Sequence, residues 1–581
     1  MLRRSLRLLD QRLHVRDDGR IDPAMARVTL IAAAVVGLFM TTVAVRMFGP
    51  TIHPDEFGFL INGQVLIGRD EAPIPTGSFY PAGYGLLTGV AHLLTGSMEG
   101  AYRVSLLANV VLGVATAAAA HRLARNGFGS SPATARLTAA LVFVVPGTIV
   151  SAMFSWAETA ARLMFLVFFA MVLRAAREKS WENVVGLGLF VGLMPALHGR
   201  FTLLVPVVLA MVALWSWQKV ASLRLLVATA TAAFAGYAMS YGLNTFIKRA
   251  VYTTSYDQEN RLLERLVDVT LWPALLRTMT GQTWYLLATT FGLFGVGVAF
   301  IVVQATVSVR RDGGLRDPES TAMLVMLLGT AAVLFTGGLQ LLYGDRGDHL
   351  IYGRYVEMMV PAFLVLACVS FERTFRAAHR ALLVTGAAVL AIAAVYVLVD
   401  GGDGVKYGHF KGNLVFPNII GTDAAQYLVP IGLVPFAILF AGVIALLWMV
   451  FRAAGTWALV LAVLLFGAGS MYSGDRSLMP RTELLESSGT SIDYVLSSGG
   501  DTFGFDKGVR NDRAYYYMRY LLHPLNVEMM DLSAPGSIIR PEIECAFGWA
   551  DRPPVDGEWR IVAEETPLGR VLWQRVDSTS C

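Results

Sequence analysis

Residues 28–45, VTLIAAAVVGLFMTTVAV, contain no charged side chain. As an α-helix, a run of this length extends across most of the hydrocarbon core of a bilayer, which is about 30 Å thick. The preceding segment is basic, with Arg3, Arg4, Arg7, Arg12 and Arg16, and no small-residue cleavage site follows the apolar run. This arrangement predicts an uncleaved signal anchor whose basic N-terminus stays in the cytoplasm.

The composition of the whole chain agrees with membrane residence. Of its 581 residues, 55% are hydrophobic and 15% are charged, and the mean hydropathy is +0.55. Soluble domains carry about 25% charged residues, so much of this surface must be covered by lipid. The net charge is only +4, and the basic residues form short clusters between apolar runs rather than the continuous basic face required by nucleic acid. Nucleic-acid binding is therefore excluded.

Apolar runs recur along most of the chain. Together with the first, they predict an α-helical polytopic membrane protein of about thirteen transmembrane helices. The predicted spans lie near residues 28–46, 101–120, 137–153, 158–174, 183–197, 201–216, 222–242, 283–305, 320–341, 356–371, 381–399, 429–450 and 455–472.

The basic residues between these runs predict the orientation, because short cytoplasmic loops are enriched in Lys and Arg. With the N-terminus inside, every predicted cytoplasmic loop is basic. These loops contain Arg122, Arg125 and Arg136; Arg174, Arg177 and Lys179; Lys219 and Arg224; Arg310, Arg311 and Arg316; Arg373, Arg376 and Arg380; and Arg452. An odd number of spans then places the C-terminus outside a plasma (inner) membrane.

Three regions follow from this topology. Residues 1–27 form a cytoplasmic N-terminus, residues 28–472 form a transmembrane domain, and residues 473–581 form an extracytoplasmic domain. The long loops 47–100, 243–282 and 400–428 lie on the same external face as that last domain.

The extracytoplasmic domain has the pattern of a small α/β fold. We expect a helix around 515–520 and a hairpin that pairs 559–562 with 570–573 across the turn 566–569. Cys545 and Cys581 would form a disulfide in an oxidising compartment. The aromatic residues of this domain either fill its core or stack on sugar rings; they include Tyr515, Tyr516, Tyr517, Trp549 and Trp573.

Three acidic residues are candidates for chemistry. Pro54 and the apolar spacing after it predict a short amphipathic helix on the membrane surface, with Asp55 and Glu56 in its first turn. The helix dipole keeps such a carboxylate ionised and available as a base or a cation ligand. Glu158 lies in a short external turn between two spans, where a charge near hydrocarbon is often functional. The alternative is that Asp55 and Glu56 only favour a first turn and that Glu158 is a surface acid.

Basic residues gather on the same predicted face. His198 and Arg200 lie at one external junction of two spans, and Arg354 and Tyr355 lie at another. The planar guanidinium group binds phosphate oxygens well. A single interfacial Arg can also serve only to anchor a helix end. Acids and arginines together on one face nevertheless indicate a site.

These features together resemble the GT-C superfamily, whose members are membrane glycosyltransferases that use lipid-linked sugar donors. The resemblance rests on the signal anchor, the Asp55-Glu56 pair, the segment Tyr80-Pro81-Ala82-Gly83-Tyr84, the number of spans and the external C-terminal domain. The architecture is similar to that of bacterial aminoarabinose and arabinofuranosyl transferases and of protein mannosyltransferases.

The resemblance implies roles for the candidate residues. Asp55 would activate the acceptor hydroxyl, with Glu56 beside it, and Glu158 would be a further acid for the acceptor or for a divalent cation such as Mg²⁺ or Mn²⁺. Arg200 and Arg354, with His198 and Tyr355, would hold the donor phosphate. The partners would be a polyprenyl-phosphate sugar and a glycan, lipid or protein acceptor in the cell envelope. Neither the sugar nor the acceptor is specified by the sequence.

Two other functions are compatible with a polytopic chain. A transporter or lipid flippase would carry ionisable residues deep within its spans and often two repeated halves, and no such repeat is detectable. A polysaccharide polymerase or ligase would place Arg and His residues in a large late loop, whereas residues 400–428 contain only Lys406, His409 and Lys411 as basic side chains.

Overall fold

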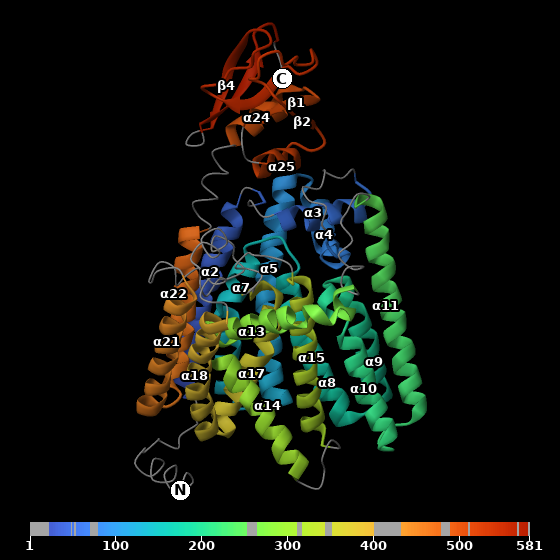
Figure 1. The fold of residues 1–581 in the computed structure, drawn as a ribbon, viewed down its shortest axis with the longest axis vertical. Helices are drawn as coiled ribbons and strands as arrows, with labels where there is room; N and C mark the ends of the chain where they lie inside the picture. The colour runs from blue at the N-terminus through green and yellow to red at the C-terminus, as the bar shows by residue number, and fades with distance from the viewer. Residues whose placement is uncertain are drawn as a thin grey trace.

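A bundle of membrane-length helices carries a small domain at one end (Figure 1). The computed structural model describes residues 22–47, 49–50, 54–69, 79–252, 264–310, 317–342, 351, 353–399, 432–477, 489–508, 512–565, 569–578 and 581. The predicted external loop 400–428 lies outside these residues, as do most of 1–27, Tyr352 and the turn residues 566–568.

Helices account for the bundle. They are α2 (Pro23–Arg46), α3 (Pro54–Leu66), α4 (Gly85–Thr95), α5 (Met98–Arg122), α6 (Pro132–Val144), α7 (Pro146–Ala152), α8 (Glu158–Glu178), α9 (Trp181–Leu193), α10 (Leu204–Trp217), α11 (Leu223–Val251), α13 (Trp272–Thr289), α14 (Leu293–Arg310), α15 (Pro318–Gln340), α17 (Val360–Arg373), α18 (Phe375–Val399), α21 (Leu433–Ala454) and α22 (Trp457–Ser477). Short 3₁₀ turns interrupt them at η1 (Ala82–Tyr84), η3 (Met194–Ala196), η4 (Gly199–Phe201), η5 (Val269–Leu271), η7 (Gly353–Tyr355) and η8 (Glu357–Met359), and a π turn follows α5 at η2 (Leu123–Gly127).

The predicted spans coincide with helices throughout the described chain. Nine described helices are long and apolar enough to cross a membrane, or ten if α13 and α14, which meet at a bend of 109°, are taken as one span. The remaining three predicted runs fall on shorter or broken helices, namely α6 with α7, α9 with η3, and η8 with α17. These short helices are possible because they are buried in the bundle. There, neighbouring protein groups form the hydrogen bonds that the backbone N–H and C=O groups at the breaks would lack in lipid.

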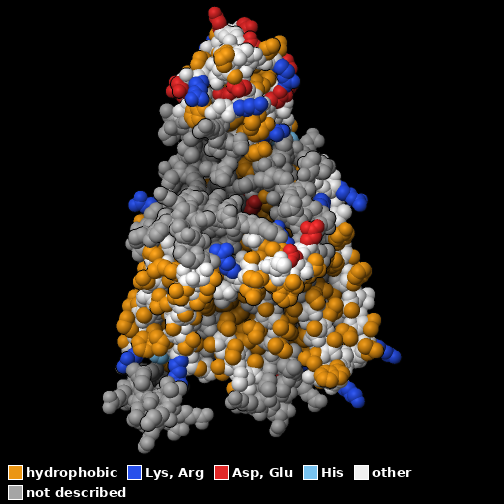
Figure 2. Space-filling view, viewed as in Figure 1, with side chains coloured by type: hydrophobic (Ala, Val, Ile, Leu, Met, Phe, Trp, Pro, Cys, Tyr) orange, Lys and Arg blue, Asp and Glu red, His pale blue; other side chains and the backbone are white. Residues whose placement is uncertain are grey.

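Contacts at the two ends of α2 show which other segments lie at each end of the bundle. Near the start of α2, Met25 contacts Thr456 in the turn between α21 and α22. At the other end of α2, the Arg103 side chain of α5 donates to the Met47 carbonyl at 2.9 Å. Figure 1 shows α3, α4 and the C-terminal domain at this second end. Figure 2 shows hydrophobic side chains around the body of the bundle and Lys and Arg side chains near its opposite end.

Helix α3 forms where it was predicted but is not a surface helix. Phe57, Leu60 and Ile61 of the predicted apolar face are buried, and so are Glu56 and Asn62. The helix is covered on both sides, because α4 packs along it and the C-terminal domain rests on it. Tertiary packing therefore encloses a segment whose sequence alone suggested an open membrane surface.

The C-terminal domain is a five-stranded mixed sheet with two helices. Its strands β1 (Thr502–Asp506), β2 (Asn526–Met530), β3 (Cys545–Trp549), β4 (Trp559–Glu565) and β5 (Arg570–Arg575) follow the order β2-β1-β3-β5-β4. Parallel pairing joins β2, β1 and β3, and antiparallel pairing joins β3, β5 and β4. Helices α24 (Gly489–Ser498) and α25 (Asp512–Leu521) complete the domain. The predicted helix and hairpin are both confirmed.

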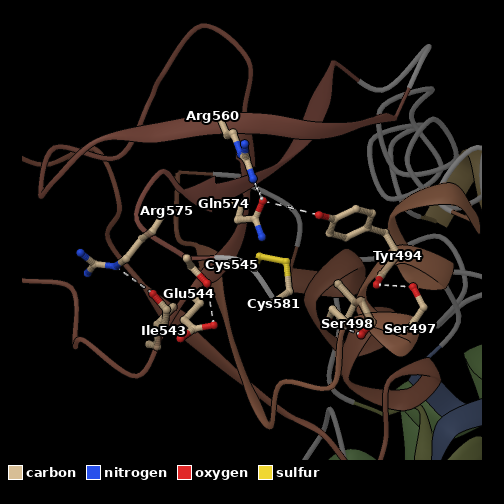
Figure 3. The surroundings of a disulfide bond; sticks show 12 residues. Tyr494, Ser497, Ser498, Ile543, Glu544, Cys545, Arg560, Gln574, Arg575 and Cys581 are labelled. Atoms are coloured by element: carbon tan, nitrogen blue, oxygen red, sulfur yellow. Dashed lines mark hydrogen bonds between the residues drawn. A yellow bond between two sulfur atoms is a disulfide. The ribbon is translucent and has the colours of Figure 1, made fainter.

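A disulfide closes this domain. Cys545 of β3 is bonded to Cys581, as predicted, and Figure 3 shows the bond beside Gln574, which receives hydrogen bonds from Arg560. Tyr515, Tyr517 and Trp573 are buried. Tyr515 and Trp573 therefore fill the core of the domain, and Tyr517 packs against the bundle, so these three rings form no exposed platform.

Helix α25 attaches the domain to the bundle. The Tyr520 ring meets the Phe57 ring of α3 edge-on at 5.7 Å between centroids, and its hydroxyl donates to the Met98 carbonyl at 3.3 Å. Tyr517 packs so closely against Gly49 that a side chain at residue 49 would displace it. The C-terminal domain thus lies directly over the helix that carries Asp55.

Candidate functional site

Three segments that are distant in the sequence bring the candidate residues together. Asp55 lies in the first turn of α3, where Pro54 favours helix initiation and free backbone N–H groups favour acidic side chains. Glu158 begins α8, immediately after Trp156 and Ala157. Arg354 lies in the short turn η7. All three are near the end of the bundle that carries the C-terminal domain.

The Arg354 guanidinium connects the two acids. Its Nη1 donates to Asp55 Oδ2 and its Nε donates to Glu158 Oε1. The group also lies over the Trp156 ring, 4.1 Å from its centroid. Side chains of Arg354 and Glu158 are 7% and 5% exposed, whereas that of Asp55 is 21% exposed. Asp55 is therefore the member of this trio with the most access to a substrate.

Tyr80 holds the other oxygen of Asp55. Its hydroxyl donates to Asp55 Oδ1 at 2.7 Å. The Tyr80 ring lies across α3 at Gly58, where any side chain would collide with it. The segment Tyr80-Pro81-Ala82-Gly83-Tyr84 thus places the Tyr80 hydroxyl against Asp55. The lack of a side chain at Gly58 makes room for the Tyr80 ring.

Glu56 points into a separate buried network. It accepts hydrogen bonds from the Tyr102 hydroxyl at 2.7 Å and from the Ser155 backbone N–H at 3.0 Å, and it is fully buried. Its carboxylate therefore ties α3 to α5 and to the loop before α8. Adjacent residues of a helix face different directions, which separates Glu56 from Asp55.

The second predicted basic group forms a cluster of its own. Arg200 Nε donates to Gln340 Oε1 at 2.8 Å, and Arg200 Nη1 lies 2.9 Å from His198 Nε2. The same guanidinium lies 3.1 Å from the centroid of the Tyr355 ring. Burial and the positive charges of Arg200 and Arg354 lower the pKa of His198 well below its usual value. His198 is therefore neutral at pH 7.

The cluster around Arg354 and the cluster around Arg200 are neighbours. Arg354 of the first and Tyr355 of the second are consecutive residues of η7. All four predicted basic-site residues, His198, Arg200, Arg354 and Tyr355, are thus near one another, as the sequence suggested. Their contacts differ, however. Arg354 contacts carboxylates, whereas Arg200 contacts Gln340, His198 and Tyr355.

Sequence reasoning missed one buried ion pair beside the site. Arg162 of α8 and Glu357 of η8 are both buried, with Arg162 Nη1 3.5 Å from Glu357 Oε2. The Tyr285 hydroxyl of α13 donates to Glu357 Oε1. The available signal was spacing, since Arg162 lies one helical turn after Glu158 and Glu357 lies three residues after Arg354.

The carboxylates do not assemble into a recognisable metal site. Within the described residues, no three His, Cys, Asp or Glu side chains are grouped so that they could hold an ion. Asp55 and Glu158, the acids considered for Mg²⁺ or Mn²⁺, converge on the Arg354 guanidinium. We therefore assign no metal ligand among these acids.

Comparison with solved structures identifies the architecture. ArnT from Cupriavidus metallidurans bound to undecaprenyl phosphate superposes with a TM-score of 0.52 at 15% identity, over 95% of this chain and 99% of ArnT. This chain has a GT-C fold. Apo ArnT from the same organism gives a TM-score of 0.49 at 15% identity, over 94% of this chain and 97% of ArnT. The Archaeoglobus fulgidus oligosaccharyltransferase gives 0.44 at 12% identity, over 86% of this chain and 64% of that enzyme.

Comparisons by sequence identify no relative of this chain. No protein-family model and no curated protein matches it. At 15% identity, the likeness to ArnT concerns the fold, and the activity must be argued from the residues of the site.

Proposed function

We propose that this protein is a glycosyltransferase that moves a sugar from a polyprenyl-phosphate donor to an acceptor on the extracytoplasmic face. The observation that carries the proposal is the environment of Asp55, a partly exposed carboxylate held by Tyr80 and Arg354. The GT-C fold supports it, because ArnT, which shares that fold, has been solved with undecaprenyl phosphate bound.

Asp55 would act as the general base. It would take the proton from the acceptor hydroxyl as that oxygen attacks the anomeric carbon, while the bond from that carbon to the phosphate oxygen breaks. Attack from the side opposite the phosphate inverts the configuration. Two fixed contacts, from Tyr80 and Arg354, orient the carboxylate before the acceptor arrives. General-base assistance of this kind contributes about 10²–10⁴-fold in rate.

The departing phosphate gains negative charge and needs positive partners nearby. Arg200 suits this role, because its buried guanidinium lies on the ring of Tyr355, the residue next to Arg354. Arg354 would be shared between the acids and the phosphate, so that donor binding weakens its hold on Asp55. Charge stabilisation of this kind is strongest where water is excluded, and both guanidinium groups are buried.

The direct test is a membrane assay with a panel of radiolabelled polyprenyl-phosphate sugars, which scores which donor is consumed. Membranes with the wild-type chain should consume one donor and release polyprenyl phosphate. Membranes with Asp55→Asn should not, although the variant accumulates normally. Equal consumption by the two would refute the role of Asp55, and consumption of no lipid-linked sugar by the wild type would refute the proposal.

One observation favours a second candidate, a transporter or lipid flippase. The buried charges of Arg162 and Glu357 lie one turn further into the bundle than Glu158, where ionisable residues often mark a transport path. Liposomes containing a fluorescent polyprenyl-phosphate lipid distinguish the two functions. A flippase would move the lipid between leaflets without an acceptor, and a transferase would not. For a polymerase or ligase, the discriminating segment 400–428 lies outside the described residues.

A further inference from the structure

Two ion pairs join α8 to the turns η7 and η8, and α8 contributes the acid to one pair and the base to the other. Glu158 and Arg162, four residues apart on α8, lie on one face of that helix. Arg354 and Glu357 lie three residues apart on the two consecutive 3₁₀ turns. Glu158 pairs with Arg354, and Arg162 pairs with Glu357. Each segment therefore supplies one acid and one base to its neighbour.

The inner pair is enclosed on every side that the structure describes. Gly147, at the start of α7, packs so tightly that a side chain there would overlap both Arg162 and Glu357. Tyr285 hydrogen-bonds to Glu357, and its ring lies against Gly353, the residue before Arg354. A small cavity beside the pair is lined by Arg162, Glu357 and Thr290. The Nε and Nη2 atoms of Arg162 have no hydrogen-bond partner among the described residues.

This enclosure makes Glu357 a competitor for Arg354. A buried carboxylate strongly favours any cation within reach, and Glu357 follows Arg354 by three residues, on the next 3₁₀ turn. Were Glu357 without Arg162, the guanidinium of Arg354 could satisfy it by turning inward. That movement would take Arg354 away from Asp55.

We propose that Arg162 is a positioning residue: by neutralising Glu357 it keeps Arg354 on Asp55 and Glu158. The assignment rests on the proposed function only in that Asp55 is the catalytic base. It predicts an asymmetry between the two members of the inner pair. Removing the charge of Arg162 releases a competing anion and disturbs the site, whereas removing the charge of Glu357 removes the competitor and leaves Arg354 in place.

The test uses full-length protein in lipid nanodiscs without any donor. Dicyclohexylcarbodiimide, an apolar reagent that modifies protonated carboxyl groups, is applied at pH 7, and the modification of Asp55 is measured by peptide mass spectrometry. Loss of an adjacent guanidinium raises the pKa of a carboxylate by about one unit or more. Modification of Asp55 in Arg162→Met should therefore rise by about tenfold. Glu357→Gln and the double variant R162M/E357Q should match the wild type.

Two further variants serve as controls. Arg162→Lys keeps the charge and should also match the wild type. Arg177→Met, which breaks an ion pair with Glu319 near the far end of α8 at 2.9 Å, should do so as well. Wild-type labelling in R162M would overturn the proposal, and so would equally raised labelling in the double variant.

Glu357→Gln remains decisive if Arg162→Met does not assemble. A pair that served only to hold the helices together would be broken equally by the loss of either member, so raised labelling of Asp55 in E357Q would refute the positioning role. Because labelling is measured without donor or acceptor, this outcome is separate from the outcome of the sugar-transfer assay.

Discussion

Arg354 of η7 donates to Asp55 of α3 across a sequence separation of 299 residues. This contact places a buried cation on the carboxylate with the greatest exposure in the site. An adjacent guanidinium favours the charged form of a carboxylate, which suits an acid that is to accept a proton. The relationship makes Asp55 and Arg354 one functional unit.

Loss of the Asp55 carboxylate should abolish transfer without unfolding the protein. Asp55→Asn keeps the shape of the side chain and can still accept a hydrogen bond from Tyr80, but it cannot take a proton. We expect the rate to fall by about 10²–10⁴-fold, with binding of undecaprenyl phosphate retained. Radiolabelled sugar transfer and lipid binding measure the two effects. Asp268→Asn, at an exposed cap of η5, is the matched control; full activity in D55N would contradict the assignment.

Arg200 should contribute mainly to binding of the donor phosphate. Removing one partner of a buried charged contact costs about 2–5 kcal/mol, so Arg200→Ala should weaken binding of undecaprenyl phosphate by at least tenfold. Thermal-shift titration of purified protein with undecaprenyl phosphate measures the change. Arg224→Ala, an exposed arginine at the opposite end of the bundle, is the control. Unchanged affinity in R200A would move the phosphate site away from the cluster of Arg200, His198 and Tyr355.

Acid should destabilise the protein through His92, which lies in α4 beneath the C-terminal domain. Burial, with smaller effects from Arg69 and His523, lowers the pKa of His92 to about 4. The unfolded chain, with a pKa near 6.5, binds a proton there that the folded protein does not. Stability from this residue is therefore complete above pH 6.5 and falls as the pH drops toward 4, by about 3 kcal/mol in total.

The measurement is the melting temperature in detergent between pH 7 and pH 4. The wild-type melting temperature should fall more steeply than that of His92→Gln, which carries no titrating group at this position. Parallel curves for the two proteins would show that His92 does not contribute to the acid sensitivity.

The orientation of the bundle can be tested by cysteine labelling. Cys368 is buried and the other two cysteines form a disulfide, so the natural background is low. The positive-inside rule predicts that exposed cysteines replacing Arg69 or Ser497 react with an impermeant thiol reagent in intact cells. A cysteine replacing Arg224 should react only after lysis. Reaction of R69C only after lysis would place Asp55 in the cytoplasm and contradict the proposed transfer on the extracytoplasmic face.

The structure decides which positions of α3 can carry a cysteine. Gly63 lies within this helix. Its α-carbon, however, faces Thr88 and Gly89 of α4 so closely that no side chain fits. Arg69, just beyond the end of α3, is exposed and takes the cysteine instead.

The local elements of this protein can be predicted from its sequence. Hydropathy located every predicted span on a helix or a broken helix, and turn and strand patterns located α25 and the β4–β5 hairpin. Pro54 and the acids after it predicted the start of α3. These features depend on residues close together in the chain, so periodicity and capping are enough to find them.

Which side chains meet depends on how the helices pack. The sequence offered Asp55, Glu158 and Arg354 as separate candidates, but not the guanidinium that bridges the two acids, nor the separation of Glu56 into another network. The spacing along the chain puts Arg162 one helical turn after Glu158, but it does not show that Arg162 pairs with Glu357. The physical reason is that ion pairing depends on distances of a few ångströms between atoms, and helix packing sets those distances between residues hundreds of positions apart.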